Sequence, residues 1–120
     1  MAIRIREISA MPPDEVQQDD IEKQTKKLVK KIGELQRTLY AEARHSLLIV
    51  LQGMDASGKD GTARRVLAKT SAAGVDVYSF KKPTTEEFAH DFLWRVHRQV
   101  PRKGYIQVFN RSHYEDVLIQ

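Results

Sequence analysis

Residues 47–59 read Leu47-Leu48-Ile49-Val50-Leu51-Gln52-Gly53-Met54-Asp55-Ala56-Ser57-Gly58-Lys59. The first five residues form an uninterrupted apolar run, which is typical of a strand buried on both faces of a parallel sheet. The last seven match the pattern G-x-x-x-x-G-K, a glycine-rich turn between a strand and a helix. Together they predict an α/β fold with an open parallel sheet and a phosphate-binding loop.

The loop is suited to hold an anion. Gly53 and Gly58 let the backbone curl, so that successive N–H groups point at one phosphate. The positive end of the following helix acts at the same place, and Lys59 can reach the outer phosphate oxygens. The alternative is a glycine turn with a surface lysine. The predicted phosphate-binding residues are Gly53, Met54, Ala56, Ser57, Gly58, Lys59, Asp60 and Gly61.

Acidic residues distinguish this loop from the usual pattern. Asp60 stands where a serine or threonine normally supplies a hydroxyl to magnesium, so another ligand is needed, and Asp55 is the candidate. A carboxylate inside the loop would repel the substrate unless a cation lies between them, which predicts Mg²⁺ bridging Asp55 to the phosphates. Alternatively, Asp55 acts as a base, orients the nucleophile or only forms the turn. Asp60 is either a favourable acid in the first helical turn or a functional residue.

A second polar cluster follows the predicted strand 105–109. Because the ends of neighbouring parallel strands meet at one crevice, residues 110–115 should lie beside the bound phosphates. Arg111 is the predicted catalytic cation, with a plain surface arginine as the alternative. Asn110 and Glu115 join Asp55 as predicted metal ligands. For His113 and Tyr114, packing or a hydrogen bond to the loop is expected.

Two lysines follow the predicted strand 75–80. Lys81 and Lys82 are predicted to contact the nucleotide or a polyanion, although a solvated loop would have the same composition. Four further cations are assigned only to a general basic field: Arg95, Arg98, Arg102 and Lys103.

Three helices are expected around these strands. Residues 1–18 form an irregular arm, and residues 19–120 form the domain. A helix begins at Asp19 or Asp20 with an Asx cap, and its apolar stripe covers the chain's own sheet or a partner subunit. A second helix spans 61–73 and stops at Gly74. A third opens with a capping box at Thr84 and runs to about Gln99. The stripe of the first helix is Ile21, Leu28, Ile32, Leu35 and Leu39, and that of the third is Phe88, Phe92, Leu93 and Val96.

Composition sets wider bounds. The 120 residues include no cysteine, which excludes disulfides and thiolate metal sites and fits a cytoplasmic location. The longest apolar run is too short for a membrane span, and the first residues lack the apolar core of a secretion signal. A net charge of +4 and a pI near 9.4 favour anionic partners. The apolar residues 117–120 look cut off, so the domain is expected to be incomplete at its C-terminus.

The stretches 53–61 and 109–116 together closely resemble the family-2 polyphosphate kinases, and so do residues 82–87 and 92–95 between them. The resemblance covers about residues 20–120. It implies a thymidylate-kinase-like fold and Mg²⁺-dependent phosphate transfer between inorganic polyphosphate and a nucleotide. Asp55 would bind metal and orient the nucleotide, Lys59 would bind phosphate, and Arg111 would contact the transition state.

The form of the second motif resembles the family branch that phosphorylates both nucleoside mono- and diphosphates. AMP and ADP are therefore the expected acceptors, ATP is an expected product, and a homo-oligomer without nucleic-acid or membrane partners is expected. Family members continue into a helical lid beyond this length. Two alternatives stay open: a phosphate- or polyphosphate-binding module without turnover, and an ATP-dependent small-molecule kinase, against which Asp60 counts.

Overall fold

A computed structural model describes residue 4 and residues 7–114 of the chain. Its elements, in chain order, are α1 (Gln18–Glu42), β1 (Leu47–Leu51), α2 (Lys59–Val66), β2 (Val75–Ser79), α3 (Thr85–Ala89), α4 (Trp94–His97) and β3 (Ile106–Asn110). The three strands form one parallel sheet in the order β1-β3-β2. The predicted strands are all present, and each ends within one residue of its expected position.

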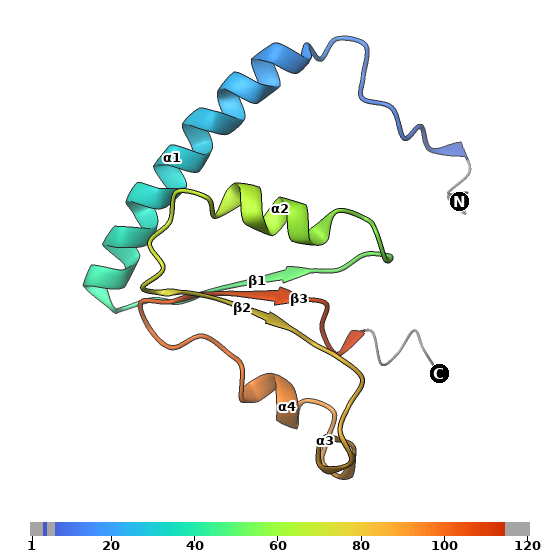
Figure 1. Cartoon of the computed structure of the whole chain (residues 1–120), viewed down its shortest axis with the longest axis vertical. Helices are drawn as coiled ribbons and strands as arrows, with labels where there is room; N and C mark the ends of the chain where they lie inside the picture. The colour runs from blue at the N-terminus through green and yellow to red at the C-terminus, as the bar shows by residue number, and fades with distance from the viewer. Residues whose placement is uncertain (1–3, 5–6, 115–120) are drawn as a thin grey trace.

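Helices lie on both sides of this sheet (Figure 1): α1 and α2 on one side, α3 and α4 on the other. The core forms around the central strand, where Phe109 packs edge-to-face on Phe80 and Phe80 on Tyr78. Val96 of α4 is buried against the same rings. The parallel strands bring their carboxyl ends to one edge, since Leu51, Asn110 and Ser79 share one register position.

The prediction that the strand 47–51 is buried on both faces is wrong for the described chain. Leu47, Leu48 and Val50 of β1 are exposed, whereas Ile106 to Phe109 of β3 are buried. The reason is position: β3 lies between two strands, and β1 pairs only with β3 within the described residues. The apolar run of β1 therefore indicates its strand conformation correctly but not its burial.

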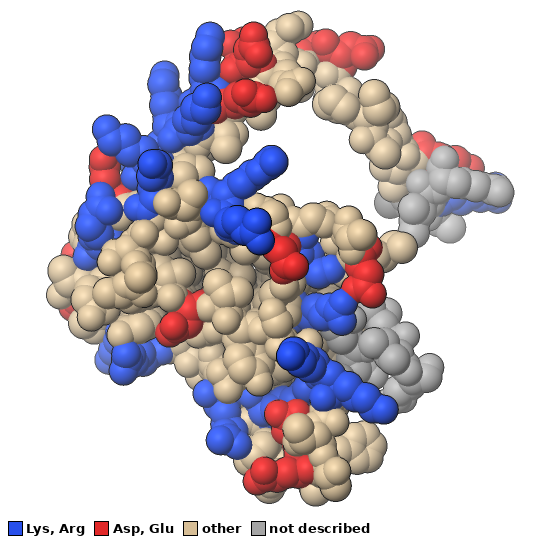
Figure 2. Space-filling view, viewed as in Figure 1, with Lys and Arg blue, Asp and Glu red and all other residues tan. Residues whose placement is uncertain are grey.

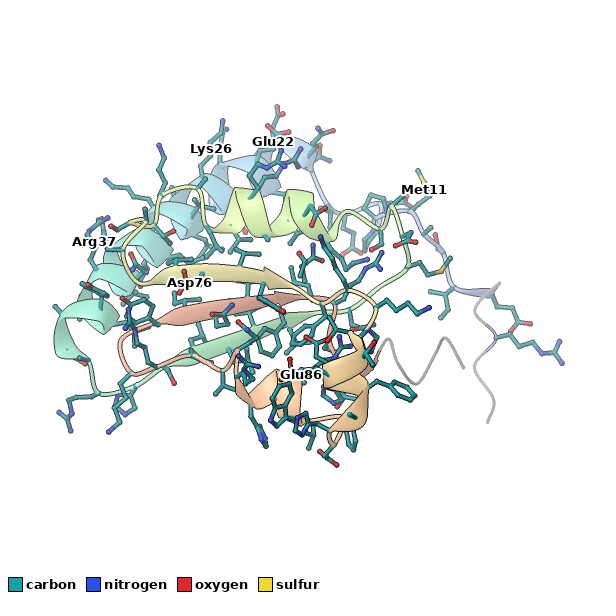
Figure 3. All side chains as sticks on the ribbon, turned by 60° about the horizontal axis from the view of Figure 1, so that its bottom comes forward. Met11, Glu22, Lys26, Arg37, Asp76 and Glu86 are labelled. Atoms are coloured by element: carbon teal, nitrogen blue, oxygen red, sulfur yellow. The ribbon has the colours of Figure 1, made fainter. Side chains whose placement is uncertain are left out.

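Helix α1 begins at Gln18 with Gln17 as N-cap, and no side chain makes the capping hydrogen bond. The predicted Asx cap is wrong. Asp19 and Asp20 lie inside the first turn, where their negative charges stabilise the helix by interacting with the positive end of its dipole. The lysines of α1 are exposed, and Figure 3 shows Glu22 and Lys26 pointing outward.

The buried face of α1 differs from the predicted leucine stripe. Leu28 and Leu35 are exposed, and Ile21 is also exposed. Gly33 and Gln36 are the buried residues of this helix. Ile32 and Leu39 of the predicted stripe are half-buried. Beside them, Gln36 donates to the Ala73 carbonyl (2.9 Å) and accepts from the Ser71 N–H (3.0 Å), so a side chain–backbone clamp accompanies a narrower apolar contact than expected.

Helix α2 starts two residues before the expected residue 61 and ends at Val66, well before Ala73. It ends early because the Thr70 hydroxyl and N–H both bond the Leu67 carbonyl in a tight turn. Gly74 therefore does not stop the helix. With φ +87°, it packs against α1, where an added Cβ would lie 2.5 Å from the Tyr40 ring.

The predicted third helix is two short helices. Its capping box is confirmed, with Thr84 as N-cap of α3 and Glu87 as the reciprocal partner. The helix breaks at His90, which is extended, and the Asp91 carboxylate accepts the Leu93 N–H (2.9 Å). Of the expected inner stripe, Val96 is buried and Leu93 half-buried, but Phe88 and Phe92 are exposed.

No helix in the described part of the chain is both long and apolar enough to cross a membrane. The apolar stretch 117–120, and Glu115 among the predicted metal ligands, lie outside the described residues.

Candidate functional site

The loop between β1 and α2 is closed by its own lysine. The Lys59 Nζ atom donates to the carbonyls of Gly53 (2.6 Å) and Met54 (2.7 Å) and to the Ser57 hydroxyl (3.3 Å). These bonds hold the ammonium group across the mouth of the turn. The predicted loop thus exists as a turn around a cation at the N-terminus of α2.

The two loop glycines serve different needs. Gly58 has φ +87° and is the N-cap of α2, so its conformation favours glycine. Gly53 is needed for space, because a Cβ there would lie 2.8 Å from the Ser57 hydroxyl. Ala56 adopts φ +60° without being glycine. Only one of the two glycines therefore fits the expected role of a backbone curl.

The second polar cluster meets the loop as predicted. A hollow of about 290 Å³ is lined by the loop residues 55–60 together with Asn110 and Arg111 from the end of β3. The Arg111 N–H donates to the Leu51 carbonyl (3.0 Å), which joins the end of β3 to the end of β1. The register of the parallel sheet thus brings residues far apart in sequence to one site.

Arg111 lies directly opposite Asp55. Its guanidinium forms an ion pair with the Asp55 carboxylate, although the Asp55 side chain is 85% exposed. Arg111 has φ +69°, a left-handed conformation that costs a non-glycine residue about 1–2 kcal/mol. The backbone therefore accepts strain at the position that turns this arginine toward the loop.

Sequence reasoning missed two residues that support this arrangement. Ser112 is 1% exposed, and its hydroxyl donates to the Gln52 side chain (3.2 Å) and accepts the Tyr114 N–H (3.2 Å). Gln52 directly precedes Gly53, so this bond is a second tie between the two motifs. No local signal could have identified the pair, because it depends on the β1–β3 register.

Asn110 and Asp60 form the polar floor of the hollow. The Asn110 amide nitrogen donates to the Asp60 carboxylate, and its buried Oδ1 atom has no hydrogen-bond partner among the described residues. The described residues contain no cluster of three or more His, Cys, Asp or Glu side chains for a metal. Magnesium binds through one or two carboxylates, substrate phosphates and water, and it prefers oxygen ligands. The Asp55 carboxylate and the unpartnered Asn110 oxygen are donors of the kind that this ion prefers.

The remaining predicted residues lie around the hollow. Met54 is an exposed side chain of the loop, and Gly61 is exposed in α2, where an added Cβ would meet nothing within 4 Å. His113 packs its ring against Tyr114 (4.4 Å) and Phe92 (5.8 Å), in agreement with the expected packing role.

Lys81 and Lys82 are exposed in a separate groove at the end of β2. Arg95 lines this groove too and is 7% exposed, so its assignment to a general basic field is wrong. Exposed basic side chains also gather along the outside of α1 (Figure 2), at Lys23, Lys26, Lys27, Lys30 and Lys31.

Residues 15–120 match the family model for polyphosphate kinase 2. The chain belongs to the polyphosphate kinase 2 family. The predicted P-loop kinase-like α/β fold is confirmed by a solved structure, polyphosphate kinase 2 from Arthrobacter aurescens TC1. It matches with a TM-score of 0.87 and 37% identity, over 98% of this chain and 44% of that one.

Curated relatives in the polyphosphate kinase 2 family are closer in sequence. An AMP/ADP-polyphosphate phosphotransferase from Meiothermus ruber is 58% identical over 92 residues, which are 77% of this chain and 34% of the relative. An ADP-polyphosphate phosphotransferase from Rhodopseudomonas palustris is 52% identical over 91 residues, 76% of this chain and 32% of the relative. The chain thus spans about a third of the length of these relatives.

Proposed function

We propose that this chain carries the phosphate-binding part of a Mg²⁺-dependent enzyme that transfers phosphate between inorganic polyphosphate and adenine nucleotides. In this proposal, residues 19–120 form the N-terminal portion of a P-loop phosphotransferase domain that follows an irregular arm. The observation that carries it is the ion pair between Asp55 and Arg111. Asp55 lies inside the loop and Arg111 follows the neighbouring strand, and both line one hollow. Family membership and the presence of Lys59 in the same loop support this reading.

In the proposed transfer, an oxygen of the nucleotide's terminal phosphate attacks the terminal phosphorus of the polymer. The bond from that phosphorus to its bridging oxygen breaks, and the shortened polymer keeps the electron pair. Negative charge spreads over the transferred group, so positioning and charge neutralisation matter more than proton abstraction. Magnesium, which Asp55 and Asn110 would help to hold, would neutralise part of this charge.

The chain's own residues have separate tasks in this scheme. The Lys59 ammonium exchanges its bonds to the loop oxygens for bonds to phosphate oxygens, which the backbone N–H groups of residues 53–61 also hold. Arg111 neutralises the transferred group. Asp55 orients Arg111 through their ion pair and supplies a carboxylate oxygen for the metal. Asn110 supplies its unpartnered amide oxygen, and Asp60 anchors the Asn110 amide nitrogen. Glu115 is retained as a proposed third metal ligand.

We propose both AMP and ADP as acceptors, with ATP formed from ADP. The relative from Meiothermus ruber is named for both nucleotides, and it shares 58% identity with this chain over the matched region. Lys81 and Lys82 are proposed to contact the nucleotide or the polymer. The expectations of a cytoplasmic homo-oligomer without nucleic-acid or membrane partners stay predictions.

The test is ATP formation by the full-length protein from long-chain polyphosphate, ADP and Mg²⁺, followed by luciferase. Asp55→Asn keeps the shape of the side chain and removes its charge, and we expect a loss of about 10²–10³-fold in kcat. Asp76→Asn on β2, toward the amino end of the strand, is the matched control and should retain activity. Unchanged activity in Asp55→Asn would refute the metal role.

Two other results would overturn the proposed reaction and favour a different function. Calorimetric binding of polyphosphate without detectable transfer would favour a binding module. Phosphorylation of a non-nucleotide acceptor by ATP, with polyphosphate inert, would indicate an ATP-dependent small-molecule kinase.

A further inference from the structure

Arg95 of α4 is a buried arginine in a region where the nearby basic residues Arg98 and Arg102 are exposed. A buried guanidinium is tolerated only when its charge and its N–H groups are satisfied. Its Nη1 atom donates to the Lys81 carbonyl (2.7 Å) and lies 3.4 Å from the Glu87 carboxylate. Its guanidinium carbon lies 5.2 Å from the Phe80 ring centre. These contacts direct Arg95 at the backbone of the turn that follows β2.

Glu87 holds the other end of the same turn. Its Oε2 atom accepts the Thr84 N–H (3.0 Å), and its own N–H donates to the Thr84 hydroxyl (3.2 Å). Because the same Oε2 atom also faces Arg95, both ends of the turn 81–84 are joined through one ion pair. The backbone of the turn is thereby held, while the Lys81 and Lys82 side chains remain exposed.

The turn is also tied to the candidate site. The Phe80 N–H donates to the Asn110 carbonyl (3.2 Å), and the Phe80 ring packs on Phe109 of β3 at 4.9 Å. Asn110 and the next residue, Arg111, line the hollow of the phosphate loop. A groove lined in part by Ser79, Lys81, Lys82, Thr84, Glu87 and Arg95 therefore opens at the same edge of the sheet.

We infer that Arg95 and Glu87 form a positioning pair that holds the Lys81–Lys82 turn as a preformed site for a phosphate group of the substrate. The inference rests on the proposed function, in which two phosphorylated substrates meet at this edge. A buried ion pair adds little net stability compared with apolar residues of similar size. Its directional bond to the Lys81 carbonyl is something that an apolar side chain cannot supply. The phosphate belongs to the acceptor nucleotide or to the polymer, and the two are separated by experiment.

The experiment is a double-mutant cycle on binding constants in the full-length protein. Calorimetry gives Kd for AMP and, separately, for a polyphosphate of defined length. The variants are Arg95→Met, the pair Lys81→Met with Lys82→Met, and all three changes together. If Arg95 acts through the turn, Arg95→Met and the lysine pair each raise Kd by about tenfold, and the triple variant adds no more than about twofold. The ligand whose Kd rises identifies which phosphate the turn binds.

Arg98→Met is the matched control for loss of a nearby positive charge. Arg98 stacks on Trp94 at 4.7 Å and is exposed, so its removal should change Kd by less than about twofold. Losses that multiply in the triple variant, or an unchanged Kd for both ligands in Arg95→Met, would overturn the inference.

If Arg95→Met shows no cooperative melting, and is therefore not folded, Glu87→Gln tests the positioning pair instead. Its amide oxygen can still accept the Thr84 N–H, so the cap remains while the charge facing Arg95 is lost. We expect Kd to rise by about threefold, and an unchanged Kd would overturn the inference. All these measurements are binding constants. A protein that binds the ligands but transfers no phosphate would therefore refute the proposed reaction and leave the test of the positioning pair unaffected.

Discussion

The phosphate loop and the Lys81–Lys82 turn both present lysines at the carboxyl edge of the sheet, but they are held in different ways. In the loop, Lys59 bonds to residues between Gly53 and Ser57, and Gly58 provides the turn at the start of α2. In the turn, the tethers come from Glu87 on α3 and Arg95 on α4. The local contacts leave motifs in the sequence: the glycine-rich pattern around Lys59 and the Thr84–Glu87 capping box. The bond from Arg95 to the Lys81 carbonyl joins residues 14 positions apart and leaves no motif.

The largest effect is expected from removing the loop's cation. Lys59→Met should lower transfer by the full-length protein about 10²–10³-fold, because one donor to the developing charge is lost. The melting temperature should change little, since the hydrogen bonds that the lysine makes within the described residues are all to its own loop. Steady-state kinetics and thermal unfolding measure the two quantities. Lys27→Met, an exposed lysine of α1, is the control, and equal loss in both variants would contradict a local role.

Two glycines on either side of Lys59 should respond with opposite signs. Gly58→Ala places a side chain at φ +87° and should destabilise the fold by about 1–2 kcal/mol. Gly61→Ala lies inside α2 with open space around it and should stabilise by about 0.5–1 kcal/mol. Urea unfolding measures both. Equal shifts of the same sign would mean that the loop backbone differs from the one described.

The smallest effect concerns the turn's own cap. Thr84→Ala removes the hydroxyl that accepts the Glu87 N–H and should cost about 1 kcal/mol of stability. Thr85→Ala, at the first residue of α3, is the matched control and should stay within about 0.5 kcal/mol. A rise in Kd for AMP or polyphosphate in Thr84→Ala alone would show that the turn depends on both tethers. If the two variants behave alike in stability, the capping box contributes nothing measurable.

The sequence predicted the strands well because their signals are local. The apolar run of β1, the alternation in β2 and the glycine-rich turn each lie within a few consecutive residues. The predicted helix boundaries were wrong where a side chain forms a hydrogen bond with the backbone, as at Thr70 and Asp91. The predicted buried face of α1 omitted Gln36, because a buried amide that bonds two backbone groups does not appear in an apolar pattern.

At the candidate site, residue types and their spacing were enough to select Asp55, Lys59, Asn110 and Arg111. Their proximity was expected from the general rule for parallel strands, and the structure places all four around one hollow. Ser112 and Gln52 could not have been selected, because their bond depends on the register between β1 and β3. Arg95 was assigned to a general basic field, because its local sequence does not distinguish it from Arg98 and Arg102, and its burial depends on contacts with Lys81 and Glu87.

The sequence alone determined the phosphate loop, the parallel α/β architecture and the family. Each depends on a short run of residues whose backbone chemistry or apolar pattern acts locally. Tertiary structure alone decided which strand is central, that Arg111 faces Asp55, and that Arg95 is buried beneath the Lys81–Lys82 turn. The physical reason is that burial and ion pairing depend on neighbours brought together by the sheet register, which no single stretch of the chain specifies.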